Sequence, residues 1–416
     1  MATDLLPVTG SKILHSGLAF AYAAIVAKLL GPTAYGLFAV SLAVTAIAAE
    51  ITGQGLEVTM VRIVARSGAA DRPELASPAY RAVFKLKLLV NGVLAIAGWL
   101  AAEPVSALLG DPAYRLPIQL GACGALGFSL WRLVLAVLQS QQAFGAYAVV
   151  QSAAGVFKMV ALGLLLILAR IELHLLLIVH VSSFFVGFLI ALLFVPRESL
   201  PRRLEKDPGA WRSVVAYGKW IVGASLLAGV NAWLAVLAVG YFVGTRAAGE
   251  YAAAHMLIGA CDVLMISLNT VLLPIACRVA TRSAGTAYLK QAFRVSGLLS
   301  AALLPGYFLA GPLVALVYSQ AFEASVPVLR ILFWGFLVSL NVHPALLILH
   351  SKNRPEVVAG LECFKLVLHA LACALLIPRL AVVGAALATT LSRLAGGTAG
   401  LFLVHAVLRH QPRGER

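Results

Sequence analysis

The sequence predicts an all-α integral membrane protein with about twelve transmembrane helices in two parallel six-helix lobes. Hydrophobic residues make up 61% of the 416 residues, and charged residues only 12%, against roughly 25% in a soluble domain. Mean hydropathy is +0.94. Apolar runs of about 20 residues, long enough for a helix to cross a roughly 30 Å hydrocarbon core, recur along the whole chain. Two short patterns also repeat half a chain apart, which indicates an internal duplication.

The apolar runs form two sets of six. The first set lies at residues 14–30, 37–58, 83–102, 116–138, 148–169 and 173–195, and the second at 214–243, 251–276, 295–318, 326–349, 357–377 and 382–408. Each run is continuous rather than alternating, which favours helices over β-barrel strands. The longest polar linker, 197–212, separates the sets, so the predicted lobes are residues 1–203 and 204–416. Because each set has an even number of spans, the second set enters the membrane from the same side as the first, which makes the repeats parallel.

The repeated patterns mark matching places in the two sets. GPTAYGLFAV at residues 31–40 and GTRAAGEYAA at 244–253 share a Gly-x4-Gly spacing, and we expect each to form a tight turn between two helices. Phe-Lys-Met-Val at 157–160 and Phe-Lys-Leu-Val at 364–367 each lie midway along an apolar run. The chain therefore reads as two copies of one membrane unit.

The formal net charge of +15 is distributed between the spans on alternate sides. Basic residues gather at 62–81, 197–212, 278–294, 352–354 and 409–416, whereas the opposite connections hold little beyond Arg115, Arg170, Arg246 and Arg379. The positive-inside rule makes the basic face cytoplasmic and places both termini there. Because no soluble basic segment exists, we expect no nucleic-acid partner. The N-terminus has no basic region or cleavage site of a signal peptide, so the first span is expected to remain.

Several ionisable residues fall within the spans. Each charged group facing lipid would cost about 2.5–3.5 kcal/mol, so most are expected to face the protein interior. They are Glu50, Arg132, Lys158, Asp262, Arg330, Glu362, Lys365 and Arg393, together with His180, His255, His343 and His369. Five cations against three anions favour an anionic ligand.

These residues give two candidate sites. The candidates for binding an anionic headgroup are Lys158, Lys365, Arg393, Arg132 and Lys28, and those for ion coupling are Asp262, His255, Glu50 and Glu362. Structural alternatives stay open for both groups. Side chains near span ends, such as Lys28 and Arg330, can extend to the lipid headgroups, and mid-span cations can form ion pairs.

The two mid-span lysines differ in their neighbours. Glu362 lies three residues before Lys365 and shares its helical face, so a simple ion pair there would be neutral. Gly155 stands at the matching place before Lys158, so Lys158 needs a partner from elsewhere or a substrate. Asn231, Asn269 and Asn341 are expected to join helices by hydrogen bonds.

No catalytic or cofactor motif is present. The sequence lacks G-x-S-x-G, H-E-x-x-H and a phosphate-binding G-x-x-x-x-G-K-[ST], and its five cysteines have no metal-ligand spacing. We expect no catalytic residues, no metal and no cofactor, and therefore not an enzyme.

Three stretches form an ordered pattern along the chain: LGPTAYGLFA at 30–39, LVYSQAF at 316–322 with VPVLRIL at 326–332, and IPR at 377–379 with GAALAT at 384–389. Together they resemble oligosaccharide flippases, the polysaccharide-biosynthesis branch of the multidrug/oligosaccharidyl-lipid/polysaccharide exporter superfamily. The chain departs from the family pattern at Gly53, where an acidic residue is common, but Glu50 and Glu57 share that helical face. It also departs at Leu380 and Ala381, where an aromatic residue and glycine are common.

The resemblance implies a V-shaped, MATE-like transporter in a bacterial inner membrane. Its expected substrate is an undecaprenyl-pyrophosphate-linked oligosaccharide, an O-antigen, capsule or exopolysaccharide unit, moved to the outer leaflet by alternating access. Implied partners are membrane lipids, a polysaccharide polymerase and a chain-length regulator. Two other functions remain open: a cation-coupled multidrug exporter of the same superfamily, and a non-transporting assembly factor of a polysaccharide-synthesis complex.

Overall fold

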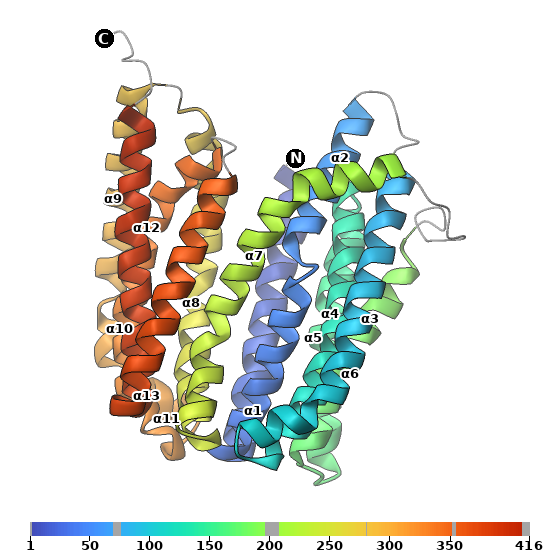
Figure 1. Cartoon of the computed structure of the whole chain (residues 1–416), viewed down its shortest axis with the longest axis vertical. Coiled ribbons are helices and arrows are strands. Elements are labelled where there is room, and N and C mark those ends of the chain that lie inside the picture. The colour runs from blue at the N-terminus through green and yellow to red at the C-terminus, as the bar shows by residue number, and fades with distance from the viewer. Residues whose placement is uncertain (1, 70–75, 196–207, 280, 352–354, 410–416) are drawn as a thin grey trace. The chain divides into compact units, whose positions relative to one another are not determined.

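The computed structural model describes residues 2–69, 76–195, 208–279, 281–351 and 355–409, and these ranges contain helices and no strand (Figure 1). The helices of the first half are α1 Ala2–Glu50, α2 Gln54–Ala69, α3 Ala76–Leu108, η2 Pro112–Tyr114, α4 Arg115–Ser140, α5 Phe144–Ile167 and α6 Leu173–Leu192. Those of the second half are α7 Pro208–Phe242, α8 Thr245–Cys277, α9 Arg282–Leu303, α10 Pro305–Phe308, α11 Ala310–Val317, η4 Gln320–Phe322, α12 Ser325–Ser351 and α13 Pro355–Arg409.

The chain forms two compact units, Met1–Gly229 and Val230–Arg416. Helix α7 contributes its first part to the first unit and its last part to the second. The boundary expected from the sequence, between residues 203 and 204, lies outside the described residues.

Helix α1 is a hairpin of two helical limbs. Gly31 interrupts it with φ 71° and ψ 174°, a conformation almost restricted to glycine. The rings of Tyr22 and Phe38 lie 6.2 Å apart across the turn, whereas in a straight helix these residues would be about 24 Å apart. Figure 1 shows the two limbs running in opposite directions. The turn expected at residues 31–40 is therefore present.

Helix α13 is a second hairpin, interrupted at Ala381 with φ 49° and ψ −129°. Ser392 Oγ donates to the backbone oxygen of Lys365 at 3.0 Å, although a straight helix would separate these residues by about 40 Å. Thus α13 also contains two of the expected spans.

The connections repeat from one half to the other. Gly244, between α7 and α8, has φ 115° and ψ 179°, close to the extended ψ and positive φ of Gly31. Ala169, between α5 and α6, has φ 50°, as Ala381 has φ 49°. The short 3₁₀ segments η2 and η4 also precede α4 and α12 in matching order. These shared backbone features support an internal duplication.

The described helices make the chain a multi-pass integral membrane protein. Eight are long and apolar enough to cross a membrane, or nine if the bent pair 282–308 and 310–317 forms one span. Two of the eight are the hairpins α1 and α13, each long enough for two crossings. The bend between that pair is 68°, and it lies within the apolar run 295–318, which was expected to be one span. Pro305, which lacks a backbone N–H, begins α10 close to this break.

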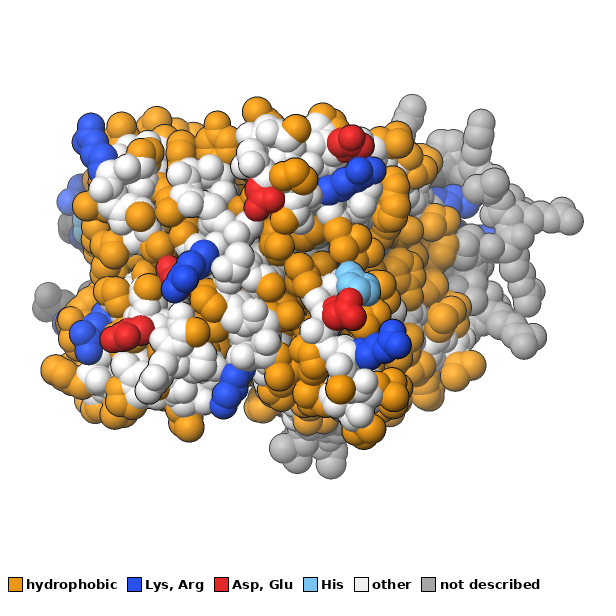
Figure 2. Space-filling model, turned by 90° about the horizontal axis from the view of Figure 1, so that it is seen from below, with side chains coloured by type: hydrophobic (Ala, Val, Ile, Leu, Met, Phe, Trp, Pro, Cys, Tyr) orange, Lys and Arg blue, Asp and Glu red, His pale blue; other side chains and the backbone are white. Residues whose placement is uncertain are grey.

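Charged side chains are sparse on the end of the molecule seen from below in Figure 2. There they stand singly or in small groups among hydrophobic ones. Large apolar side chains such as Leu100, Ile167 and Leu193 are more than 70% exposed on the helices, as lipid-facing residues are.

Candidate functional site

A network of buried charges joins α1, α2, α3 and α4 in the first unit. Arg132 donates from Nη1 to Glu50 Oε1 at 2.6 Å and from Nη2 to Glu57 Oε2 at 2.9 Å. The other oxygen of Glu57 accepts from Lys87 Nζ at 2.8 Å. Two carboxylates and two cations cancel, so this network carries no net charge.

Helical spacing brings these groups together. Glu50 and Glu57 lie two turns apart on either side of the break between α1 and α2, where Gly53 leaves room for the Glu50 side chain. On α3, Asn91 follows Lys87 by one turn, and both donate to Ser129 of α4, at 3.1 and 3.2 Å. Side chains from α3, from α4 and from the α1–α2 junction therefore hold the network in place.

Sequence reasoning selected Glu50 and Arg132 but missed Lys87, because Lys87 lies near the start of its apolar run. Its side chain is fully buried. The signal that could have found it is Asn91, one turn further on, which continues a polar stripe into the middle of the span.

A pocket of about 770 Å³, here called the Arg132 pocket, opens beside the network between α1, α2, α4 and α5. Its lining includes His15, Trp131 and Arg132, and the polar side chains Gln139, Tyr147 and Gln151. The His15 and Trp131 rings lie 5.2 Å apart, and the buried Nδ1 of His15 has no hydrogen-bond partner. The pocket thus combines aromatic rings with amide, hydroxyl and guanidinium groups and the ammonium of Lys12.

Lys158 lies on α5 and is only 4% exposed. Its ammonium is 4.6 Å from the ring centre of Phe184 on α6 and 5.9 Å from that of Tyr22 on α1. The ion pairs between described residues do not include Lys158. The ring faces stabilise the cation by roughly 0.5–2 kcal/mol each without neutralising it. We call Tyr22, Phe184 and Lys158 the lysine cage.

Lys365, the matching residue in the second unit, is neutralised. Its Nζ donates to both oxygens of Glu362, at 2.7 and 2.8 Å. The stem of Lys365 lies against Gly396 on the other limb of α13. The two matched lysines therefore differ in net local charge.

A chain of hydrogen bonds connects α7, α8 and both limbs of α13 in the second unit. His369 contacts Asn231 Oδ1 through Nδ1 at 2.9 Å and Thr389 Oγ1 through Nε2 at 3.1 Å. The Tyr251 hydroxyl lies 2.8 Å from Thr389 Oγ1. The expected helix-joining role of Asn231 is confirmed, while Tyr251 and Thr389 were not selected from the sequence.

His255 lies beside this chain. Its ring stacks on Tyr251 at 6.1 Å and meets Trp233 edge-on at 5.7 Å, and its buried Nδ1 has no partner. Asp262, expected on the same face, lies in α8, but its side chain is outside the described residues.

The remaining candidates are dispersed. Arg393 is half-buried and forms no ion pair with a described carboxylate, and Lys28 is exposed near the Gly31 turn. Arg330 lies 5.5 Å from the ring centre of Tyr307. Asn341 joins α12 to α9 through Ser296 and Ser300, and the side chain of Asn269 lies outside the described residues. In the part of the chain that the structure describes, no three His, Cys, Asp or Glu side chains form a group that could hold a metal ion.

Comparison with known families identifies the class of protein. Residues 3–280 match the family described as polysaccharide biosynthesis protein, and the chain belongs to this family. The family expected from the three sequence stretches is confirmed. No curated protein matches the chain.

Solved structures identify the fold. The chain is similar to an inward-facing multidrug resistance MATE transporter of the MOP superfamily, with a TM-score of 0.78 and 13% identity over 95% of this chain and 94% of that one. The lipid II flippase MurJ in an inward closed conformation gives a TM-score of 0.75 and 13% identity over 97% and 88%. A MOP-superfamily transporter from Pyrococcus furiosus gives 0.70 and 15% over 98% and 95%. The predicted MATE-like fold is therefore confirmed.

Proposed function

We propose that the protein is a flippase that moves an undecaprenyl-diphosphate-linked oligosaccharide across a bacterial inner membrane by alternating access. The observation that carries this proposal is Lys158, a buried cation without a carboxylate partner among the described residues, in a chain of the polysaccharide biosynthesis family. No covalent step is required.

The lysine cage suits an anion that enters and leaves. A diphosphate cannot cross hydrocarbon without replacement of its hydration, because an unpaired buried charge is very costly. The Tyr22 and Phe184 rings hold the Lys158 ammonium while no anion is bound. Phosphate oxygens would displace these weaker contacts with charge-assisted hydrogen bonds, provided the rings separate to admit them.

The cation-coupled drug exporter is the second candidate, since the fold is shared with MATE transporters. Such a protein would need free carboxylates for cationic substrates. Here Glu50 and Glu57 are occupied by Arg132 and Lys87, which favours the anionic substrate. The similar transporter from Pyrococcus furiosus is reported to have a binding pocket of reverse polarity, which suggests a different function for it. Pocket polarity therefore differs among proteins of this fold.

Transport by reconstituted protein tests the proposal. Vesicles that contain the full chain and a fluorescent undecaprenyl-diphosphate oligosaccharide should expose the glycan to an external glycosidase faster than vesicles that contain the same lipid without the protein. Lys158→Ala should weaken substrate binding by roughly ten- to a hundredfold, Lys158→Arg should retain part of it, and the exposed control Lys290→Ala should retain all. Wild-type rates from Lys158→Ala at equal protein content would refute the assignment. Absence of any transport would instead favour the assembly factor.

The proposed orientation places both termini and the linker 197–212 in the cytoplasm, because the basic loops lie on that side. A single cysteine at Ser199 should react with an impermeant maleimide only after cells are permeabilised. The linker lies outside the described residues, so this placement rests on its sequence. Labelling in intact cells would reverse the orientation.

A further inference from the structure

The Arg132 pocket has a chemistry different from that of the lysine cage, although both lie in the first unit. We propose that this pocket binds the first, uncharged sugar of the glycan while Lys158 contacts the diphosphate. The inference rests on the proposed function and adds to it the chemical class that the pocket recognises.

The charges beside Arg132 are balanced within the protein, which favours hydroxyl groups over phosphate at that place, while Lys12 adds one exposed cation to the pocket lining. Arg132 is already paired with Glu50 and Glu57, and Lys87 balances the second carboxylate. A phosphate here would have to compete with two carboxylates already in place. An arginine with its carboxylates still offers N–H donors and oxygen acceptors side by side, and sugar hydroxyls both donate and accept.

The walls of the pocket fit a sugar ring. The rings of Trp131 and His15 line one wall, 5.2 Å apart, and the unpartnered Nδ1 of His15 gives this wall an unused polar atom. Tyr147 and Gln151 add a hydroxyl and an amide. The volume of about 770 Å³ lies within the roughly 300–1,000 Å³ of typical small-molecule sites.

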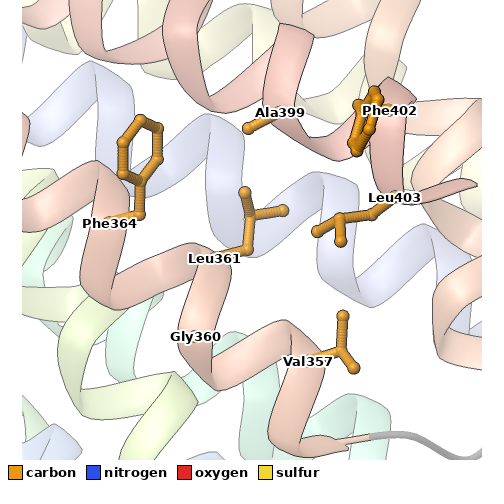
Figure 3. Close-up of a pocket in the computed structure, with 7 residues that line it drawn as sticks. All are labelled: Val357, Gly360, Leu361, Phe364, Ala399, Phe402 and Leu403. Carbon is orange, nitrogen blue, oxygen red and sulfur yellow. The ribbon is translucent and has the colours of Figure 1, made fainter.

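A second pocket provides a contrast. It has a volume of about 410 Å³ and lies between the two limbs of α13, lined by apolar side chains such as Leu361, Phe364 and Phe402 (Figure 3). None of its labelled side chains carries a nitrogen or oxygen atom, so it offers a hydroxyl group no side-chain partner. Only the Arg132 pocket of these two has the groups that a sugar needs.

The two sites in the first unit share an aromatic wall. The Lys158 ammonium lies 4.6 Å from the Phe184 ring centre, and that ring lies 6.0 Å from the ring of Trp131. A diphosphate and the sugar attached to it are directly bonded, so they would occupy neighbouring places of this kind.

Paired probes separate the sugar contact from the diphosphate contact. The purified full chain in detergent would be titrated with farnesyl diphosphate and with farnesyl-diphospho conjugates of glucose, galactose and N-acetylglucosamine. At least one conjugate should bind more tightly than farnesyl diphosphate. The double variant Tyr147→Phe, Gln151→Leu should lose roughly five- to a hundredfold of conjugate affinity, because two hydrogen bonds are removed, and should keep its affinity for farnesyl diphosphate.

Two further variants complete the test. Gln119→Leu, a buried glutamine of α4 outside the pocket, should bind every probe as the wild type does. Lys158→Ala should weaken all probes alike. The sugar proposal is overturned if the double variant keeps the full advantage of the conjugates, or if the wild type shows no such advantage. Unchanged binding of every probe to Lys158→Ala would overturn the diphosphate contact at Lys158, on which the proposed function rests, without bearing on the sugar contact.

Discussion

Removal of Lys87 is expected to destabilise the first unit more than removal of any exposed lysine. Its side chain is fully buried and donates to Glu57 at 2.8 Å and to Ser129 at 3.2 Å. Lys87→Met keeps much of the apolar stem but leaves the network with one excess negative charge. Loss of one partner from a buried ion pair costs about 3–5 kcal/mol, because the other charge stays buried without compensation.

A second substitution should recover most of this loss. Adding Glu57→Gln to Lys87→Met removes the excess charge and leaves Arg132 with Glu50, a neutral pair at 2.6 Å. Replacement of a whole buried ion pair by uncharged groups is often close to neutral. We therefore expect the double variant to be more stable than either single variant.

Thermal unfolding in detergent, followed by size-exclusion chromatography, measures these effects. For a unit of this size 1 kcal/mol shifts Tm by roughly 2–4 °C, so Lys87→Met should lower Tm by on the order of 10 °C. Lys290→Met, at an exposed position, controls for the loss of a lysine. A Tm for Lys87→Met within about 2 °C of wild type, or additive losses in the double variant, would refute the charge-balance reasoning.

Two other predictions concern the second lysine and the turns. Lys365→Ala should lower membrane abundance by leaving Glu362 without its bidentate partner, and adding Glu362→Gln should restore abundance; failure of that rescue would exclude a purely structural ion pair. Gly31→Ala and Gly244→Ala should each destabilise the protein by about 1–3 kcal/mol in thermal unfolding, because both residues have positive φ although a Cβ would meet no atom within 4 Å. The helical control Gly163→Ala, which also has open space, should be neutral or stabilising, and equal losses at all three glycines would contradict the backbone argument.

Much of the fold could be predicted because membrane crossing requires long apolar runs. The turns at Gly31 and Gly244 were visible as a repeated glycine spacing, and both have the positive φ that glycine permits. Ala381 was harder, because alanine at φ 49° has no sequence signature of its own. The bend between α9 and α11 was also missed, since apolar composition continues through Pro305.

The candidate site was only partly predictable because pairing in space depends on packing between helices. The pair of Glu362 and Lys365 could be expected, since both residues lie on one helical face. The partners of Arg132 are Glu57 and Glu50, which lie 75 and 82 positions earlier in the sequence on other helices, so no local spacing identifies them. The contacts of Lys158 with Tyr22 and Phe184 could not be predicted either, because aromatic residues in apolar spans usually serve only to pack helices together.

The two matched lysines differ in their partners: Lys158 has no carboxylate partner among the described residues, whereas Lys365 is paired with Glu362. Gly155 precedes Lys158 by three residues, just as Glu362 precedes Lys365. Gly155→Glu would therefore give Lys158 a carboxylate on the same helical face. A side chain at residue 155 would press on Leu18, whose Cβ and Cδ1 would each lie 3.1 Å from the new Cβ. Both Gly155→Glu and Gly155→Gln are therefore made in a Leu18→Ala background, which provides the space.

The glutamate and glutamine variants have the same shape and differ in charge, so their difference reports charge alone. Gly155→Glu should neutralise Lys158 and weaken farnesyl diphosphate binding by roughly ten- to a hundredfold, as loss of one charge-assisted contact would. Gly155→Gln should bind as the Leu18→Ala background does. If the two variants bind equally, the free charge of Lys158 does not hold the anion. The assignment of diphosphate binding to Lys158 would then be wrong, even if both variants fold normally.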